Sequence, residues 1–369
     1  MKIYFLLGDA TAKGGIEKVT FTLASALNKY YDVKLVSLYK SGSESVFDSG
    51  DVSIKYLSNH DEISMYNRPY KGVLGYLYDF YYIIKSSYSL SSFLRKSQPQ
   101  IIVTCDIKMT LLAWLSSFFT NNKIIAIEHF EYDVAHPILK KVRQALYKKI
   151  SAVVTLTGED SDKYYWLSKY RLHVIPNIVQ IKLPASKVEK RNDIVAIGRL
   201  NEQKGFDLLI AAWSLVNVKH SDWTLKVYGD GEDKLKLEEL IEKNEIENIE
   251  LIPFTKDIDI VYQQAKAFVL SSRYEGLGMV LIEALAHRLP CVSFDCPAGP
   301  KTIIESEYNG LLVPTGDISK LAEALDRVLS SQALRNKFSA NALNSIQNFS
   351  ESNVLKQWEV LLKGIINER

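Results

Sequence analysis

Short apolar runs alternate with segments of helical periodicity along this chain, and this alternation limits the folds open to it. In the first half the runs span residues 3–7, 33–38, 52–57, 101–104, 124–127 and 152–156. Such runs are typical of strands buried on both faces of a parallel sheet. Helical patterns lie between them, among them residues 16–28 and a segment at 63–97 that carries seven tyrosines. The pattern predicts a doubly wound α/β domain.

A second series of the same kind begins near residue 193. Its apolar runs span residues 194–197, 224–228, 249–252, 267–270, 291–294 and 310–313. A stretch at 181–192 with lysine and proline is the expected linker, and a final helix is expected at 354–366. The chain is therefore predicted to form two Rossmann-like domains, residues 1–182 and 183–351, with 352–369 as a terminal helix.

Composition excludes several classes of function. The net charge of the 369 residues is only +2, which argues against a nucleic-acid partner. The charge is uneven, with 23 Lys and Arg against 16 Asp and Glu through Lys182. A basic front half favours an anionic partner on that side. The three cysteines indicate a reduced, cytoplasmic protein, and no apolar run is long enough for a signal peptide or a membrane span.

The stretch SSRYEGLGMVLIEALAHRL, residues 271–289, combines a strand end, a glycine turn and a helix start. Gly276 and Gly278 allow the backbone to approach a ligand, and the helix beginning near Met279 directs N–H groups at the turn. Glu275 and Glu283 are placed to grip two ends of one ligand. The alternative is a solvated turn glutamate and a surface ion pair, but Glu283 stands among apolar residues, where a lone carboxylate is costly to bury.

Other strand ends carry groups suited to an anionic ligand. Arg199 and Lys204 follow the first strand of the second series, where they would stabilise a diphosphate leaving group; the alternative is a pair of surface charges. Gly229 and Phe254 follow the next two strands and are placed to flank a nucleotide. In the first domain Gly14 and Gly15 open a helix after the first strand, although their spacing is not that of a dinucleotide site.

Two further features concern a histidine and a pair of aspartates. His129 ends a strand beside Glu128 and is either a hydrogen-bonding group for a ligand or a structural histidine. The pair Asp257 and Asp259 precedes a helical segment, and we interpret it as a helix cap and not as a metal site.

Residues 138–150, ILKKVRQALYKKI, form an amphipathic basic pattern without an acid. The basic positions are Lys140, Lys141, Arg143, Lys148 and Lys149. Together with the tyrosine-rich segment, this helix is predicted to rest on an anionic membrane surface. An ordinary solvated helix is the alternative.

The motifs at 275–283, with their continuation through 291–300 (CVSFDCPAGP) and 309–317 (NGLLVPTGD), resemble the E-x7-E signature of retaining glycosyltransferases of family 4. GRL-x3-KG at 198–205 and GG-x-E at 14–17 resemble the diphosphate-facing loops of that family. The resemblance implies a GT-B fold, with an interdomain cleft and a C-terminal helix that crosses back to the first domain. It also implies roles: Glu275 on donor sugar hydroxyls, Glu283 on the ribose, and the backbone of Gly276, Leu277, Gly278 and Met279 on the sugar and diphosphate.

The same resemblance implies a retaining transferase that needs no metal or other cofactor and moves a hexose or N-acetylhexosamine from a UDP-sugar. A lipid-linked acceptor such as a polyprenyl-diphosphate glycan, or another cell-envelope glycan, suits the basic first domain. This predicts a cytoplasmic protein, peripheral on the cytoplasmic face of the inner membrane. Two alternatives remain: a sugar-nucleotide epimerase of the same shape, and a non-catalytic nucleotide-sugar binding module.

Overall fold

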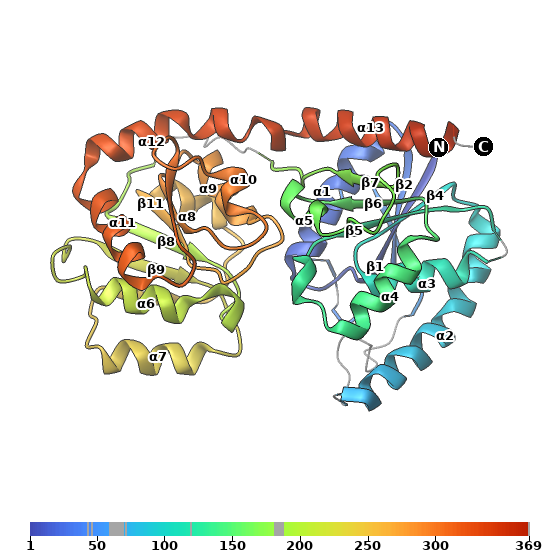
Figure 1. Ribbon diagram of the computed structural model, residues 1–369, viewed down its shortest axis with the longest axis horizontal. Coiled ribbons are helices and arrows are strands. Elements are labelled where there is room, and N and C mark those ends of the chain that lie inside the picture. The colour runs from blue at the N-terminus through green and yellow to red at the C-terminus, as the bar shows by residue number, and fades with distance from the viewer. Residues whose placement is uncertain are drawn as a thin grey trace. The chain divides into compact units, whose positions relative to one another are not determined.

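A computed structural model describes residues 1–42, 44–45, 47–58, 70, 72–118, 120–180 and 188–367 of the chain. The chain divides into two compact units (Figure 1). Unit 1 consists of Met1–Ile178 and Val354–Arg369, and unit 2 of Val179–Asn353. The C-terminal segment 354–369 therefore belongs to unit 1, and residues 179–353, which separate it from the rest of unit 1 in sequence, form unit 2.

The described residues of unit 1 form a seven-stranded sheet in the order β3-β2-β1-β4-β5-β6-β7. All neighbouring strands are parallel, and Phe5 of β1 pairs with Leu35 on one side and Val103 on the other. The strands are β1 Lys2–Asp9, β2 Asp32–Tyr39, β3 Ser53–Tyr56, β4 Ile101–Thr104, β5 Lys123–Glu128, β6 Ala152–Thr155 and β7 Leu172–Val174. The strand order reverses between β1 and β4, so ligands are expected at the carboxyl ends of these strands.

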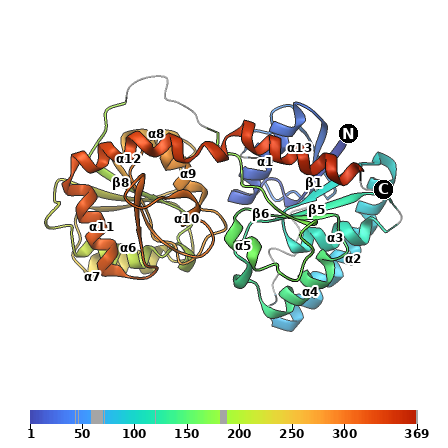
Figure 2. The same cartoon turned by 45° about the horizontal axis from the view of Figure 1, so that its top comes forward.

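Helices cover both faces of this sheet, which is why its central strands are apolar throughout. The helices of unit 1 are α1 Gly15–Asn28, α2 Gly72–Ser97, α3 Ile107–Ser116, η1 Tyr132–Val134, α4 Pro137–Tyr147, α5 Gly158–Asp162 and α13 Glu351–Asn367. Helix α13 buries Val354, Trp358 and Leu362, and Figures 1 and 2 both place it alongside α1. The apolar spacing of this last helix is thus explained by packing on the first domain.

Unit 2 repeats the arrangement with six parallel strands in the order β10-β9-β8-β11-β12-β13. Its strands are β8 Asp193–Ile197, β9 Thr224–Tyr228, β10 Ile249–Ile252, β11 Ala267–Leu270, β12 Cys291–Phe294 and β13 Gly310–Val313. Its helices are η2 Glu202–Lys204, α6 Phe206–Ser214, α7 Lys234–Lys243, α8 Ile258–Gln264, α9 Met279–Ala286, α10 Pro300–Ile303, α11 Ile318–Ser330, α12 Gln332–Ser345 and η3 Gln347–Phe349.

The core of unit 2 is built from the apolar runs of its strands and the inner faces of its helices. Trp213 of α6 and Phe294 of β12 are fully buried in it. The strand order reverses between β8 and β11, as it does between β1 and β4 in unit 1. The predicted fold, two parallel-sheet Rossmann-like α/β domains, is confirmed.

The helix expected at 63–97 is described from Gly72 to Ser97, and residues 63–69 and 71 of that prediction lie outside the described part of the chain. Two other local predictions need correction. The basic helix expected to run to residue 150 ends at Tyr147. Strand β7 was missed because His173 interrupts its short apolar pattern. Among the described residues, no helix combines the length and apolar character needed to cross a membrane.

Candidate functional site

The loops that follow β8 and β11 meet at the point where the strand order of unit 2 reverses. Gly205 ends the first loop with φ +61°, and a Cβ atom built there would lie 2.1 Å from the carbonyl oxygen of Ser271. Only glycine fits this approach without displacing backbone. The close contact explains the sequence Lys204-Gly205 and brings the lysine to the second loop.

An ion pair forms the centre of this site. Lys204 Nζ lies 2.6 Å from Oε1 of Glu275, and the hydroxyl of Ser272 donates to the same oxygen at 2.6 Å. The Glu275 side chain is buried, so both contacts operate away from bulk water. Lys204 and Glu275 were predicted from the sequence, but Ser272 was not. Its position three residues before Glu275 was the only sequence feature that could have indicated this hydrogen bond.

Glu283 lies on α9, where a tyrosine from α8 holds it. The hydroxyl of Tyr262 donates to Oε2 of Glu283 at 3.1 Å, and its ring stacks on His287 with centroids 5.1 Å apart. Burial, reinforced by the nearby Glu283 carboxylate, raises the pKa of Tyr262 well above its ordinary value, so this hydroxyl remains a donor. Tyr262 was missed because it is far in sequence from Glu283, with no motif to connect them.

Arg199 does not accompany Lys204, although both residues follow β8. Its guanidinium pairs with Glu232 at 3.1 Å, and both side chains are exposed. The two cations therefore have different surroundings: Lys204 is largely buried against a buried carboxylate, and Arg199 is exposed to solvent. This corrects the expectation of a matched pair.

The remaining donor-side residues of unit 2 lie on loops at the same edge. Gly229 has φ +155°, and an added Cβ would meet the carbonyl oxygen of Gly198 at 1.8 Å, so the loops after β8 and β9 touch through backbone. Phe254 is half-exposed, and its N–H donates to Asp230 Oδ2 at 3.1 Å. The turn from Gly276 through buried Leu277 ends at Gly278, which has φ +85° and precedes Met279 at the start of α9.

In unit 1, Gly14 and Gly15 lie at the start of α1, after β1. The carboxylate of Glu17 folds back over this turn, because a Cβ on Gly14 would lie 2.2 Å from Glu17 Oε2. Burial raises the pKa of Glu17, while N–H groups of Glu17 and Gly14 act in the opposite direction. The Glu17 carboxylate therefore fills the space beside Gly14, whereas the space beside Gly15 is open.

His129 follows β5 at the carboxyl edge of the unit 1 sheet. Burial lowers the pKa of its imidazole to about 4, so the ring is neutral at pH 7. Its Nε2 atom is buried and has no hydrogen-bond partner among the described residues. An unsatisfied buried nitrogen of this kind suits a ligand or an ordered water.

The predicted basic face on α4 is wrong in part. Arg143 is only 5% exposed and pairs through Nη2 with Glu128 Oε2 at 3.2 Å, so it belongs to the core. Lys140 pairs with Asp133 at 2.9 Å, and the ammonium of Lys149 lies 4.7 Å from the centre of the Trp114 ring. Of the five predicted basic residues, only Lys141 and Lys148 are exposed and form no side-chain ion pair or ring contact with another described residue.

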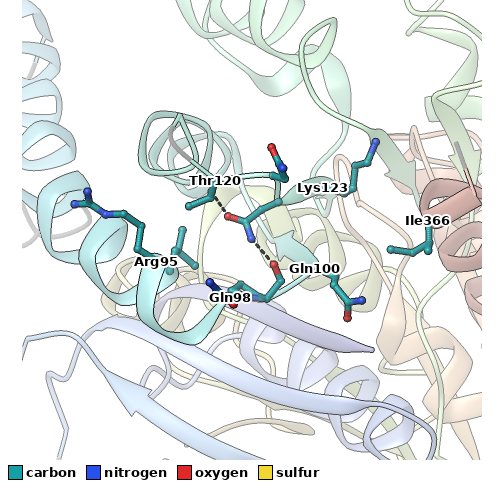
Figure 3. Close-up of a pocket in the computed structure, with 10 residues that line it drawn as sticks. Arg95, Gln98, Gln100, Thr120, Lys123 and Ile366 are labelled. Atoms are coloured by element: carbon teal, nitrogen blue, oxygen red, sulfur yellow. Dashed lines mark hydrogen bonds between the residues drawn. The ribbon is translucent and has the colours of Figure 1, made fainter. Parts of the chain in front are cut away.

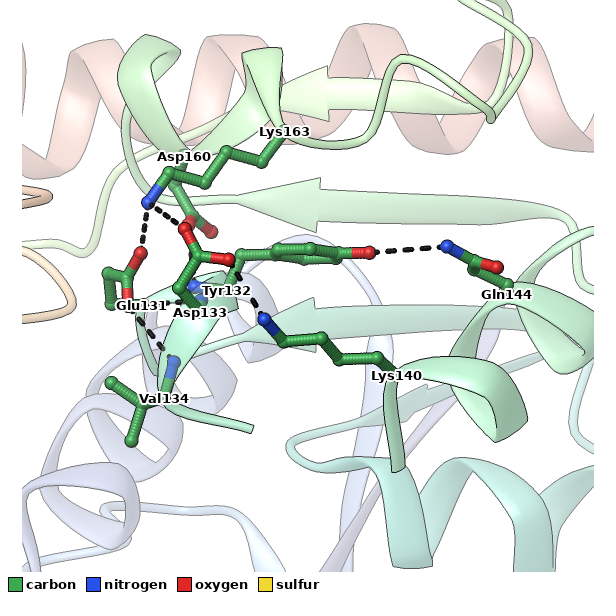
Figure 4. A network of polar contacts seen from close by, with 8 residues as sticks. All are labelled: Glu131, Tyr132, Asp133, Val134, Lys140, Gln144, Asp160 and Lys163. Carbon is green, nitrogen blue, oxygen red and sulfur yellow. Dashed lines mark hydrogen bonds and ion pairs between the residues drawn. The ribbon is translucent and has the colours of Figure 1, made fainter. Parts of the chain in front are cut away.

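A polar network connects η1, α4 and α5 near His129 (Figure 4). Glu131 accepts from the N–H groups of Asp133 and Val134 and pairs with Lys163. Asp160 accepts from the N–H of Tyr132 at 2.8 Å. Burial raises the pKa of Asp160 to about 6 despite that hydrogen bond.

The aspartate pair at 257–259 precedes α8 as predicted, with Asp257 at the N-cap position. Its side chain makes no cap hydrogen bond within the described structure, so the capping interpretation holds for position but not for contact. Asp259 lies 3.5 Å from Nε2 of His287. Among the described residues, no group of three or more His, Cys, Asp or Glu side chains is arranged to hold a metal ion.

A hollow of about 490 Å³ opens at the opposite, amino-terminal edge of the unit 1 sheet (Figure 3). It is lined by Arg95, Gln98, Gln100, Lys123 and Ile366, among others. Ligands of open α/β sheets bind beyond the carboxyl ends of the strands, so this hollow is on the wrong edge for the expected chemistry. The candidate site remains the cluster around Glu275.

Comparison with known proteins relates this geometry to a family. Residues 180–345 match the family model of glycosyl transferases group 1. The chain is 29% identical over 373 residues to the amylovoran biosynthesis glycosyltransferase AmsD of Erwinia amylovora, covering 98% of this chain and 99% of that protein. It is 24% identical over 378 residues to an α-1,4-N-acetyl-D-galactosaminyltransferase of Campylobacter jejuni, covering 100% of this chain and 99% of that protein. The Campylobacter enzyme is named for a GalNAc-containing glycan on diNAcBac-PP-undecaprenol.

Among solved structures, the Anabaena protein HepE in complex with UDP and glucose superposes with a TM-score of 0.81 at 18% identity, covering 98% of this chain and 99% of that one. This likeness supports the GT-B arrangement of the fold. The family match covers the segment of unit 2 that contains Lys204, Glu275 and Glu283. The chain thus resembles glycosyltransferases over nearly its whole length, and its residues 180–345 carry the match to glycosyl transferases group 1.

Proposed function

We propose that this protein is a retaining, metal-independent glycosyltransferase that moves a hexose or N-acetylhexosamine from a UDP-sugar to a lipid-linked or cell-envelope glycan. The observation that carries the proposal is the buried Lys204–Glu275 pair at the switch point of unit 2, inside the segment that matches glycosyl transferases group 1. A pocket that binds a sugar and a diphosphate needs one acceptor for hydroxyls and one cation for phosphate. These two side chains supply both.

The roles follow from the chemistry of each group. Glu275 would accept hydrogen bonds from donor sugar hydroxyls, while Lys204 would turn from the carboxylate toward the diphosphate as negative charge develops on the leaving group. Arg199 is exposed and would add its fork of donors to the same phosphates. Because its present partner Glu232 is also solvent-exposed, exchanging that partner for a phosphate costs little.

Glu283 would hold the ribose of the nucleotide, with Tyr262 fixing the carboxylate from behind. The backbone of the turn from Gly276 to Met279 would lie against the sugar and diphosphate. The positive φ of Gly278 supports this role, since glycine adopts this backbone conformation without strain where the turn meets α9. Gly229 and Phe254 would flank the nucleotide.

In unit 1, His129 is proposed to hydrogen-bond a sugar hydroxyl through its buried Nε2, which has no partner among the described residues. Its lowered pKa keeps the imidazole neutral at pH 7, so the ring would serve as a hydrogen-bonding group and not as a cation. Gly14 and Gly15, at the start of α1, are proposed to bind a diphosphate group through backbone N–H groups.

The proposed acceptor rests on two relatives. AmsD is named for amylovoran biosynthesis, and the Campylobacter enzyme for a glycan on undecaprenol diphosphate. An acceptor of that chemistry would place this protein at the cytoplasmic face of the inner membrane. Retention and independence from metal are part of the proposal because the E-x7-E resemblance implies both, and Lys204 with Arg199 would supply the positive charge that the leaving group requires.

The test is donor hydrolysis and transfer with the full chain. Incubation with a panel of UDP-sugars should release UDP slowly without acceptor and faster with a polyprenyl-diphosphate glycan. Release should fall on the order of 10²-fold in Glu275→Ala and Lys204→Ala. Conversion of the donor sugar without UDP release would instead make the protein an epimerase, and UDP binding without any turnover would make it a binding module.

A further inference from the structure

Helix α2 of unit 1 presents an apolar face to solvent. Seven large side chains on it are each more than half exposed: Val73, Leu74, Leu77, Phe80, Tyr81, Ile84 and Tyr88. Steps of three and four residues connect them, so they form one continuous stripe, called here the outer face of α2. Between residues 73 and 88 the stripe is about 22 Å long at 1.5 Å per residue. A patch of this size on a soluble surface marks an interaction site.

The opposite face of the helix is already fixed in unit 1. Gly75, Ile83, Leu90 and Leu94 are buried, and Asp79 pairs with Lys108 of α3 at 3.1 Å. Figure 1 shows α2 at the outside of unit 1, with its first turns extending away from the sheet. The outer face is therefore additional to the core contacts of the helix, and needs no rearrangement to become available.

All exposed charged side chains on α2 are basic. Its only acid is Asp79, which is buried, whereas Lys85, Arg95 and Lys96 are exposed. Helix α4 begins beside the same region, because His136 at its N-cap lies 5.9 Å from the ring of Tyr76. A helix with an apolar stripe, aromatic residues and flanking cations has the composition of one that lies in a lipid interface.

We propose that the outer face of α2 rests on a bilayer containing anionic lipid, with its apolar side chains at the boundary between headgroups and acyl chains. Lys85, Arg95 and Lys96 would contact lipid phosphates. The surface is argued from α2 alone and goes beyond the proposed transfer reaction. It places the membrane contact on α2, within the tyrosine-rich part of the predicted surface, because Arg143 and Lys140 of the basic helix α4 are engaged in ion pairs within unit 1.

A bilayer explains this face better than a second copy of the chain. Parallel pairing of α2 with a second copy would place Lys85, Arg95 and Lys96 each beside the same residue of that copy. Antiparallel pairing would offer these cations no carboxylate of α2, because Asp79 is buried. Like charges held together in this way oppose association. Anionic lipid provides the complementary sign together with the apolar phase that the stripe requires.

The test is flotation of the full chain with vesicles of phosphatidylcholine alone or with about 30% phosphatidylglycerol, measured at low and high salt. The unmodified chain should bind the anionic vesicles, bind neutral ones at least tenfold less, and dissociate as salt rises. The variant Leu77→Ser/Phe80→Ser/Tyr81→Ser should lose binding at least tenfold. A matched control, Tyr30→Ser/Tyr165→Ser/Tyr170→Ser, removes three exposed aromatics elsewhere on unit 1 and should bind as the unmodified chain does.

A further pair of variants separates α2 from α4. Lys85→Gln/Arg95→Gln/Lys96→Gln should weaken binding more than Lys140→Gln/Lys141→Gln/Lys148→Gln. Binding by the outer-face variant equal to that of the unmodified chain, a larger loss in the α4 variant, or no binding to either vesicle would overturn the proposal. So would a dimer of the unmodified chain that the outer-face variant converts to a monomer. UDP release measured in parallel without vesicles reports on the proposed reaction separately, because none of these residues is assigned to it.

Discussion

Lys204 Nζ and Glu275 Oε1 lie 2.6 Å apart, joining two loops that are 71 positions apart in sequence. The pair is well shielded, with the lysine 17% and the glutamate 8% exposed in their side chains. A pair of this kind contributes to stability as well as to ligand binding, and the two effects are separable by variants. The carboxylate alone would be buried without a charge partner, which costs more than losing both groups.

Lys204→Met should therefore lower the free energy of unfolding by about 3 kcal/mol, since it leaves the Glu275 carboxylate uncompensated. The double variant Lys204→Met/Glu275→Gln should recover much of this loss, while UDP release stays at the low level of the single variant. Chemical denaturation and UDP-release assays measure the two quantities. Lys219, which pairs with Asp326 in solvent, is the matched control, and Lys219→Met should cost no more than about 1 kcal/mol. Recovery of turnover in the double variant would contradict the assigned roles.

Tyr262→Phe tests whether Glu283, the proposed ribose-binding residue, depends on its hydrogen bond from Tyr262. Loss of the hydroxyl that donates to Glu283 should weaken UDP binding by more than about tenfold, in keeping with one hydrogen bond to a charged group. Turnover at saturating donor should change little, because Tyr262 acts only through Glu283. Calorimetric titration with UDP gives the affinity. Tyr228→Phe, on a neighbouring strand end, is the control, and an equal loss there would remove the special role of Tyr262.

Glu275→Ala and Glu283→Ala should distinguish the residue proposed to bind the donor sugar from the residue proposed to bind the nucleotide. Glu275→Ala should abolish most turnover and leave UDP affinity nearly unchanged, because its proposed contacts are to sugar hydroxyls. Glu283→Ala should weaken UDP itself. Calorimetry with UDP and assays with UDP-sugar measure both variants, and the reverse order of effects would exchange the two assignments.

Addition of EDTA should leave UDP release unchanged, and added Mn²⁺ or Mg²⁺ should not raise it. The proposed charge on the leaving group comes from Lys204 and Arg199, so no divalent cation is required. The control is a metal-dependent transferase assayed in the same buffer. Activity that EDTA removes and metal restores would end the metal-independent proposal.

Most of the fold was readable from the sequence because its strands are short and buried on both faces. Five strands of unit 2, among them Thr224–Tyr228 and Gly310–Val313, have the predicted bounds. The site was readable in part. Lys204 and Glu275 were identified through motifs, but their direct contact depends on how the loops after β8 and β11 fold, which no local pattern specifies.

The errors have a common physical origin. A helical pattern shows which residues share a face, but not which of the polar ones find a partner on another element. Arg143 was placed on a solvated basic face because its neighbours are lysines, whereas Glu128 at the end of β5 draws it into the core. Tyr262 was overlooked for the same reason, since its partner Glu283 is on another helix.

Substitution of Arg199 should change turnover without changing the stability of the fold. Its side chain and that of Glu232 are 70% and 59% exposed, so Arg199→Ala should change the free energy of unfolding by less than about 0.5 kcal/mol. Turnover should nonetheless fall on the order of 10²-fold if the guanidinium meets the diphosphate. Arg327→Ala is the matched control, because Arg327 forms a similar exposed pair with Glu307 away from the site, and neither quantity should change there. Normal turnover in Arg199→Ala would leave Lys204 as the single cation of the proposed clamp.

Asp160 gives a prediction in which the sign of the pH dependence is fixed. Burial raises its pKa from the ordinary 3.8 to about 6, so the folded chain holds a proton there that the unfolded chain has lost. Its contribution to stability is complete below pH 3.8 and is lost as pH rises through about 6. Asp160→Asn keeps an oxygen for the Tyr132 N–H but cannot ionise. Its free energy of unfolding should therefore rise relative to the unmodified chain by on the order of 1 kcal/mol between about pH 5 and pH 7.5. A difference between Asp160→Asn and the unmodified chain that stays constant over this pH range would show that Asp160 is ionised in the fold throughout.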